Sequence, residues 1–204
     1  MKPAALGIRM HSGWGVLVAV SESMDVIDRR RIVVTDNDGP RGNQPFHHAE
    51  ALGLPKAEPF LAKYRSESER FARAAIEAAT KELATTGYNI TAAALLLASG
   101  RPLPALQQIL ASHPLIHTAE GELFREVVST ACQMLRIPVA RYRERDLEDI
   151  AKANLASLTT NAKQKLANAG RRLGPPWTAD HKAAALAAYI VLQERTTRRK
   201  SVGT

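Results

Sequence analysis

The stretch over residues 6–20 constrains the fold more than any other part of the sequence. Apolar residues alternate with smaller or polar ones on both sides of residues 11–13, and this two-residue period is typical of strands with one buried face. We therefore predict an antiparallel hairpin that turns at residues 11–13. A polar turn then leads into a third predicted strand over residues 26–34.

This third strand contains the consecutive arginines Arg29, Arg30 and Arg31. Successive side chains of a strand point to opposite faces of the sheet, so the three guanidinium groups must divide between the two faces. A charged group on a covered face needs a partner. We expect at least one of these arginines to meet a carboxylate or to line a cleft.

Further apolar patterns predict two more strands and several helices. The nearly continuous apolar run 90–98 suits a central strand, and residues 137–142 suit a fifth strand. Residues 35–59 are rich in turn formers and predict a long loop, whereas a capping-box pattern at Ser66 predicts a helix start. Helices are expected over residues 66–86, 104–112, 118–136, 152–172 and 178–192, with a further short helix after Asp146 that runs through Ala151. The class is α/β, with a mixed five-stranded sheet whose first three strands are antiparallel, flanked by helices.

Size and charge limit the classes of protein to which the chain can belong. Its 204 residues are 45% hydrophobic and suffice for a single domain, expected over residues 1–194 with a flexible basic tail over 195–204. No apolar run approaches the roughly 20 residues that cross a bilayer, so we predict no membrane association and a cytoplasmic location. The net charge of +8 favours acidic partners, DNA or RNA among them. The single cysteine, Cys132, lies in an apolar helical pattern and is predicted to be a buried, unreactive thiol.

Two polar segments are candidates for functional sites. Residues 35–59 contain His47 and His48, but adjacent histidines diverge in most backbone conformations and no further ligand follows at a recognised spacing, so no metal site is predicted. At the start of the helix 118–136, Glu120 either complements the helix dipole or belongs to a site with His117. Gly121, unfavourable inside a helix, indicates that another backbone or a ligand approaches closely there.

The order of these elements resembles that of the ribonuclease H-like superfamily, in its resolvase-like branch. The resemblance rests on Leu6-Gly-Ile8 with the hairpin that follows, and on the alanine-rich closing segment 179–188 with Asp180 in its first turn. It implies a ribonuclease H-like sheet and, in the nucleases of the superfamily, an acid on the first strand, another after the fourth strand, and usually a pair on the closing helix. Such carboxylates hold two divalent ions about 4 Å apart.

This sequence keeps only one acid of that pattern, Asp180. Arg9 stands where the first acid is expected, residues 98–99 offer no carboxylate, and Asp180 has no acidic partner because Ala183 follows one turn later. One acid cannot hold two metal ions, so the catalytic role implied by the resemblance does not carry over, and no cofactor is predicted.

Three hypotheses follow. The favoured one is a non-catalytic ribonuclease H-like domain that binds nucleic acid through basic side chains. The second is a hydrolase or nuclease acting on phosphoesters with relocated site residues and Mg²⁺ or Mn²⁺, and the third is a protein interaction domain without a ligand. The candidate nucleic-acid-binding residues are Arg9, Arg29, Arg30, Arg31, Arg101 and Lys182. The candidate catalytic residues are His117, Glu120, Glu144, Asp146, Asp180 and His181.

Overall fold

The computed structural model describes residues 1–36, 42–98, 102–154 and 159–202 and contains a five-stranded sheet with the order β3-β2-β1-β4-β5. The first three strands are antiparallel, whereas β4 and β5 run parallel to β1. The predicted class and sheet are confirmed. The strands are β1 (Lys2–Met10), β2 (Trp14–Ser21), β3 (Val26–Val33), β4 (Tyr88–Leu97) and β5 (Val139–Arg143).

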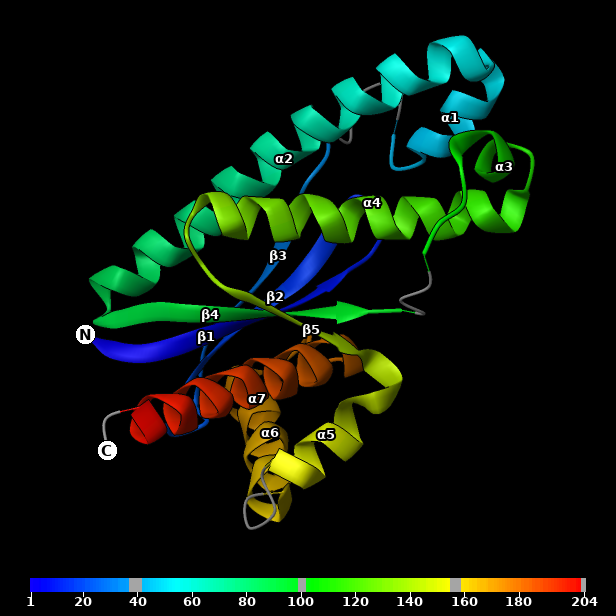
Figure 1. The fold of residues 1–204 in the computed structure, drawn as a ribbon. Coiled ribbons are helices and arrows are strands. Elements are labelled where there is room, and N and C mark those ends of the chain that lie inside the picture. Colours follow the sequence, from blue (N-terminus) through cyan, green and yellow to red (C-terminus); the bar gives the residue numbers. More distant parts are fainter. Residues whose placement is uncertain (37–41, 99–101, 155–158, 203–204) are drawn as a thin grey trace.

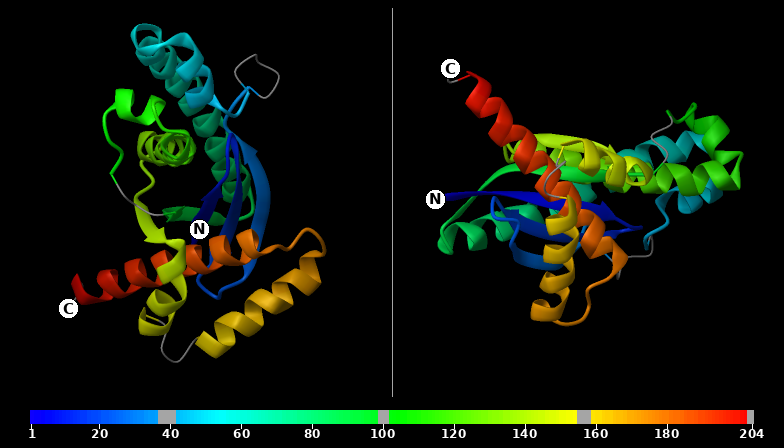
Figure 2. Two further views of the ribbon diagram at one scale, coloured as in Figure 1. Left: turned by 90° about the vertical axis from the view of Figure 1, so that its right-hand side faces the viewer. Right: turned by 90° about the horizontal axis from the view of Figure 1, so that it is seen from below.

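Helices cover both faces of this sheet. The long helices α2 and α4 pack on one face with α1 and α3, and α7 lies on the other face with α5 and α6 (Figure 1). Figure 2 shows the same two layers from two further directions. The helices are α1 (Pro45–Leu52), α2 (Leu54–Thr85), α3 (Leu106–Leu110), α4 (His113–Met134), α5 (Leu147–Asn154), α6 (Thr159–Leu173) and α7 (Ala179–Val202), with a 3-10 turn η1 (Glu144–Asp146) before α5.

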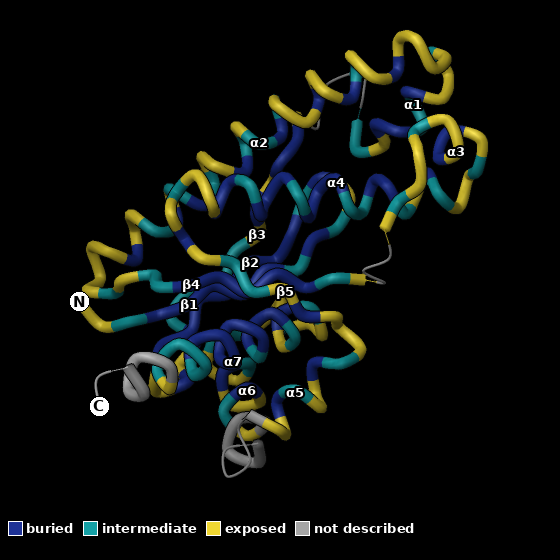
Figure 3. Tube along the Cα trace, viewed as in Figure 1, coloured by how far each residue is buried: buried dark blue, intermediate teal, exposed yellow. Residues whose placement is uncertain are grey.

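The central strand β1 has its alternate side chains in two separate cores. Leu6 and Ile8 pack with residues of α2 and α4, while Ala5 lies in the second core with residues of α7. A Cβ atom at Gly7 would lie 1.8 Å from the backbone oxygen of Ala184, so glycine permits the close approach of α7. The middle of the sheet is therefore buried on both sides (Figure 3).

The predicted long loop over residues 35–59 is wrong, because α1 lies within it and α2 begins within it, at Leu54. Likewise α4 begins at His113, five residues before the predicted start. In all three helices a proline occupies one of the first two positions: Pro45, Pro55 and Pro114. Proline favours that place because its missing N–H has no partner in the first turn anyway. The loop prediction over residues 35–59 counts Pro45 among the turn formers.

The three arginines of β3 divide between the faces, as predicted. Arg30 points toward α2 and forms ion pairs with Asp28 at 2.6 Å and Glu82 at 2.7 Å. Arg29 lies on the other face, where its guanidinium donates hydrogen bonds to backbone carbonyls of residues 173–176. Arg31 is exposed. Two of the three charges thus hold the fold together.

The closing helix is longer than predicted and continues to Val202, through the segment that the sequence assigned to a tail. Arginine and lysine are good helix formers, so a basic composition does not end a helix. None of the helices in the described ranges combines the length and hydrophobicity needed to cross a bilayer.

Candidate functional site

Three charged side chains from distant parts of the chain meet at one end of the sheet. Arg9 lies near the end of β1, Glu144 follows β5 in η1, and Asp180 is in the first turn of α7. Nε of Arg9 lies 3.1 Å from Oε2 of Glu144, and its Nη1 lies 3.1 Å from Oδ1 of Asp180. One guanidinium therefore joins the two carboxylates.

His11 belongs to the same cluster. Its Nε2 atom lies 2.9 Å both from Oδ2 of Asp180 and from Nη1 of Arg9. This nitrogen donates to Asp180 when it is protonated and accepts from Arg9 when it is not. His11 was not a predicted site residue, although its position two residues after Arg9 places both on the same side of the chain.

Trp14 extends this cluster toward β3. The ring of His11 stacks on that of Trp14 with a centroid distance of 4.2 Å and an interplanar angle of 12°. The guanidinium carbon of Arg31 lies 4.0 Å from the centroid of the Trp14 ring, in cation–π contact. An aromatic face, an imidazole and a cation are thus arranged in a row beside the Arg9 cluster.

A pocket of about 470 Å³ opens next to this row. Trp14 and the arginines of β3 line one side of it, and Thr178, Asp180 and His181 line the other. Side chains of the sheet and of the first turn of α7 therefore share a hollow at the place where the charged cluster lies.

The charges of the cluster limit its chemistry. A single cation faces two carboxylates, and the side chains of Arg9 and Asp180 are each 25% exposed. Hydrogen bonds between a guanidinium and a carboxylate occupy the oxygen lone pairs that a divalent ion would need. A metal ion could bind to Asp180 and Glu144 only after displacing Arg9 from both.

His181 has a structural partner within its own helix start. Its Nδ1 atom accepts hydrogen bonds from the backbone amide of Thr178 at 3.2 Å and from the hydroxyl of that residue at 2.8 Å. Burial of the ring and the nearby charge of Arg29 lower the pKa of His181, while Asp180 opposes them. The neutral ring therefore stabilises the start of α7 by these two hydrogen bonds.

The remaining candidates lie elsewhere or have other partners. Glu120 is buried on α4 beside His47 and His117, and Asp146 pairs with Arg143 at 2.8 Å and with Arg145 at 3.3 Å. Lys182 is exposed in the first turn of α7. Arg101 lies outside the described residues. The expected approach of a backbone or ligand at Gly121 is not seen among the described residues, where a Cβ would instead meet the Arg125 side chain of the same helix, 2.9 Å from Nη2.

One argument from the sequence is wrong in the region of His47. No further ligand was expected near it, yet His113 and His117 lie beside it. They come from α4, which was predicted to begin only at residue 118. The spacing His113-x-x-x-His117 is one helical turn and would have been visible had the helix start been placed correctly.

Three antiparallel strands, two parallel strands and a closing helix packed on the first strand define a ribonuclease H-like fold. A solved structure with this fold is that of RuvC from T. thermophilus in complex with a Holliday junction substrate, which is 10% identical, matches 95% of both chains and has a TM-score of 0.51. A second structure, Thermus thermophilus RuvC, is 12% identical over 95% of this chain and 96% of that one, with a TM-score of 0.48. No protein-family model and no curated protein sequence matches the chain.

Proposed function

We propose that this ribonuclease H-like chain binds nucleic acid without cleaving it. The observation that carries the proposal is the position of Arg9, which takes the place of the first-strand acid and holds both Asp180 and Glu144. A two-metal phosphodiester reaction needs free carboxylates around the ions. The cation in their midst supports a role in binding rather than in cleavage.

Arg9 itself is not the best phosphate ligand, because its charge already faces two carboxylates. Arg29 and Arg30 are likewise engaged with backbone carbonyls and acidic side chains. Arg31 and Lys182 are exposed, and no ion pair of either occurs among the described residues. We therefore assign the phosphate contacts to Arg31 and Lys182.

Trp14 supports this assignment by holding Arg31 at the pocket, with the His11 ring stacked at 4.2 Å and the Arg31 guanidinium carbon 4.0 Å from the ring centroid. An arginine fixed in this way can bind the phosphate backbone. Trp14 and Arg31 lie together at the pocket next to the Arg9 cluster. The net charge of +8 favours the same partner. The similar RuvC structure was solved with a Holliday junction, so a four-way DNA junction is the first ligand to try.

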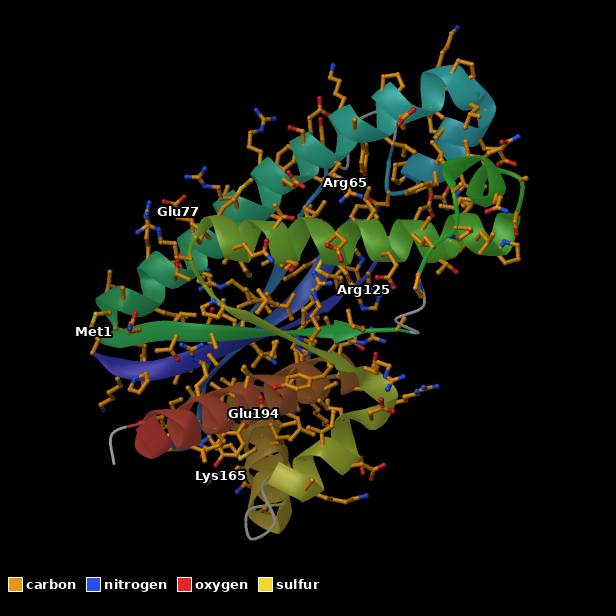
Figure 4. The ribbon with its side chains drawn as sticks, viewed as in Figure 1. Met1, Arg65, Glu77, Arg125, Lys165 and Glu194 are labelled. Atoms are coloured by element: carbon orange, nitrogen blue, oxygen red, sulfur yellow. The ribbon has the colours of Figure 1, made fainter. Side chains whose placement is uncertain are left out.

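The test is fluorescence anisotropy with a four-way junction, duplex and single-stranded DNA, and RNA, over a series of salt concentrations. We expect binding that weakens as salt increases, and a shallower salt dependence for Arg31→Ala, by about 0.9 in the slope of log K against log salt for one phosphate contact on duplex DNA. Arg65→Ala is the control, because Arg65 is exposed on α2, on the other side of the sheet (Figure 4).

Absence of binding to every one of these ligands at low salt would contradict the proposal and favour the interaction domain without a ligand. Equal losses in Arg31→Ala and Arg65→Ala would locate the binding surface elsewhere and reject the assignment of Arg31.

One observation favours a second function. Glu144 and Asp180 converge on the same guanidinium although they are 36 residues apart, so a conformational change in Arg9 would leave two carboxylates facing one another. This arrangement would suit a phosphoester hydrolase that uses Mg²⁺ or Mn²⁺. Cleavage of a labelled junction with either ion, lost in Asp180→Asn and in Glu144→Gln, would establish it. Intact DNA under all these conditions would reject this second function.

A further inference from the structure

Three histidine rings from two helices meet on the face of the sheet opposite α7. His47 lies in the first turn of α1, and His113 and His117 lie one turn apart at the start of α4. The three ring centroids are 4.5 to 5.2 Å apart, and every pair is arranged edge to face. One nitrogen of each ring can be chosen so that the three atoms lie within 4.8 Å of one another.

We propose that His47, His113 and His117 bind one transition-metal ion of the class of Zn²⁺. Two nitrogen ligands at roughly 2.0 to 2.1 Å from a tetrahedral ion lie about 3.3 Å apart. The Nε2 atoms of His113 and His117 are already 3.1 Å apart. One nitrogen of His47 lies within 4.8 Å of a nitrogen of each of the other two rings, so the His47 ring has to move closer to complete a three-nitrogen site.

A buried carboxylate orients the ring of His47 by a hydrogen bond. The side chain of Glu120 is only 3% exposed, and its Oε1 atom lies 2.9 Å from Nδ1 of His47. The same oxygen accepts hydrogen bonds from the backbone amides of Phe46 at 3.2 Å and His47 at 3.3 Å. Since a carboxylate accepts, Nδ1 carries a proton, and in the neutral tautomer that this selects Nε2 has the lone pair for a metal. Histidine ligands of metals commonly have such a carboxylate behind them.

The donor set selects the kind of ion. Imidazole nitrogens suit Zn²⁺, Cu²⁺, Ni²⁺ and Co²⁺, whereas Mg²⁺ and Ca²⁺ prefer oxygen ligands. The side chain of His117 is 55% exposed and His113 is exposed as well, so an ion would reach the site from solvent and keep a position for water. Metal binding would join α1 to α4. This inference concerns the other face of the sheet and is independent of the proposed nucleic-acid binding.

Isothermal titration of the full chain, without a histidine tag and freed of metal by a chelator, tests the site. We expect about one Zn²⁺ per chain, and with Co²⁺ the visible absorption of a tetrahedral complex. His113→Ala and His117→Ala should each abolish this binding. Both residues are exposed, so the variants should keep the fold, which circular dichroism checks.

Two further variants separate this site from adventitious binding. His48→Ala is the matched control. His48 is next to His47 on α1, but its ring packs against that of Phe60, with a centroid distance of 4.7 Å. His48→Ala should bind Zn²⁺ as the parent does, and Glu120→Gln should bind about 10- to 100-fold more weakly. The inference is overturned if the parent takes up no Zn²⁺, or if His113→Ala and His117→Ala bind it as tightly as His48→Ala does.

Discussion

Nη1 of Arg9 on the central strand lies 3.1 Å from Oδ1 of Asp180 in the first turn of the closing helix. The resemblance noted in the sequence places a metal-binding acid at each of these two positions. In this chain the pair is a cation and an anion. The charge of Asp180 is balanced by the guanidinium of Arg9. The first prediction exchanges this cation for an acid.

Arg9→Asp should create a site that binds Mg²⁺. Three carboxylates would then face one another, and their repulsion should lower the free energy of unfolding by about 1 to 3 kcal/mol. We expect Mg²⁺ to raise the melting temperature of this variant and to leave that of the parent unchanged, as measured by thermal denaturation. Mg²⁺ is chosen because histidines bind it poorly.

Arg9→Met is the control, since it removes the cation without adding an acid. Its melting temperature should respond to Mg²⁺ less than that of Arg9→Asp. A response in the parent as large as in Arg9→Asp would mean that Asp180 and Glu144 already hold a metal ion, and would reject the interpretation of Arg9.

Gly7→Ala should destabilise the chain strongly. Its Cβ would lie 1.8 Å from the backbone oxygen of Ala184, and neither strand nor helix can move away without losing buried contacts. We expect a loss of about 3 kcal/mol or more, measured by urea denaturation. Gly121→Ala is the matched control: its Cβ would meet only the end of the Arg125 side chain, and alanine favours a helix by up to about 1 kcal/mol. Similar losses in both variants would contradict the close packing of α7 on β1.

His181 should make stability depend on pH. Burial and the charge of Arg29 lower the pKa of this ring below its ordinary value of 6.5 in the folded chain. The unfolded chain therefore takes up the proton first as the pH falls. Above pH 6.5 the neutral ring makes its full contribution to the unfolding free energy. Below pH 6.5 this contribution decreases until the pH reaches the pKa of the folded state.

Urea denaturation between pH 5 and 8 measures this dependence, and His181→Asn is the comparison. An asparagine oxygen can still accept from the Thr178 amide but does not titrate. As the pH falls, the unfolding free energy of the parent should decrease relative to that of the variant. A difference that stays constant would show that His181 does not titrate with a lowered pKa.

Cys132 should be unreactive toward thiol reagents in the folded chain. Burial raises the pKa of its thiol to about 12, and the residue is 1% exposed, so the thiolate is scarce and inaccessible. With a disulfide reagent at pH 8, absorbance should develop only after denaturant is added. Rapid reaction of the native protein would mean that the core around α4 opens readily.

The alternation of residues in 6–34 predicts the hairpin, the third strand and the division of the β3 arginines, because a strand with one face in each core repeats every two residues. The closing helix was also recognisable, since its alanines permit close packing. Such local patterns depend only on neighbours in the sequence, and they supplied the fold class.

The candidate site depends on contacts that no local pattern encodes. Arg9 meets Glu144 across 135 residues, and His47 meets His113 across 66. The sequence named Arg9, Glu144 and Asp180 separately and did not predict their ion pairs. Pro45 contributed to the wrong loop over residues 35–59, because a proline is found both in turns and at the first position of helices.

The length of α2 has a consequence for the motions of the molecule. At 1.5 Å per residue its 32 residues span about 48 Å, whereas the ten residues of β4 span about 33 Å. The helix therefore reaches past the sheet, and α1 packs against α2 and α4 in that overhang (Figure 1). We expect α1 to unfold locally before the sheet does, so that its amides exchange hydrogen faster than those of β1.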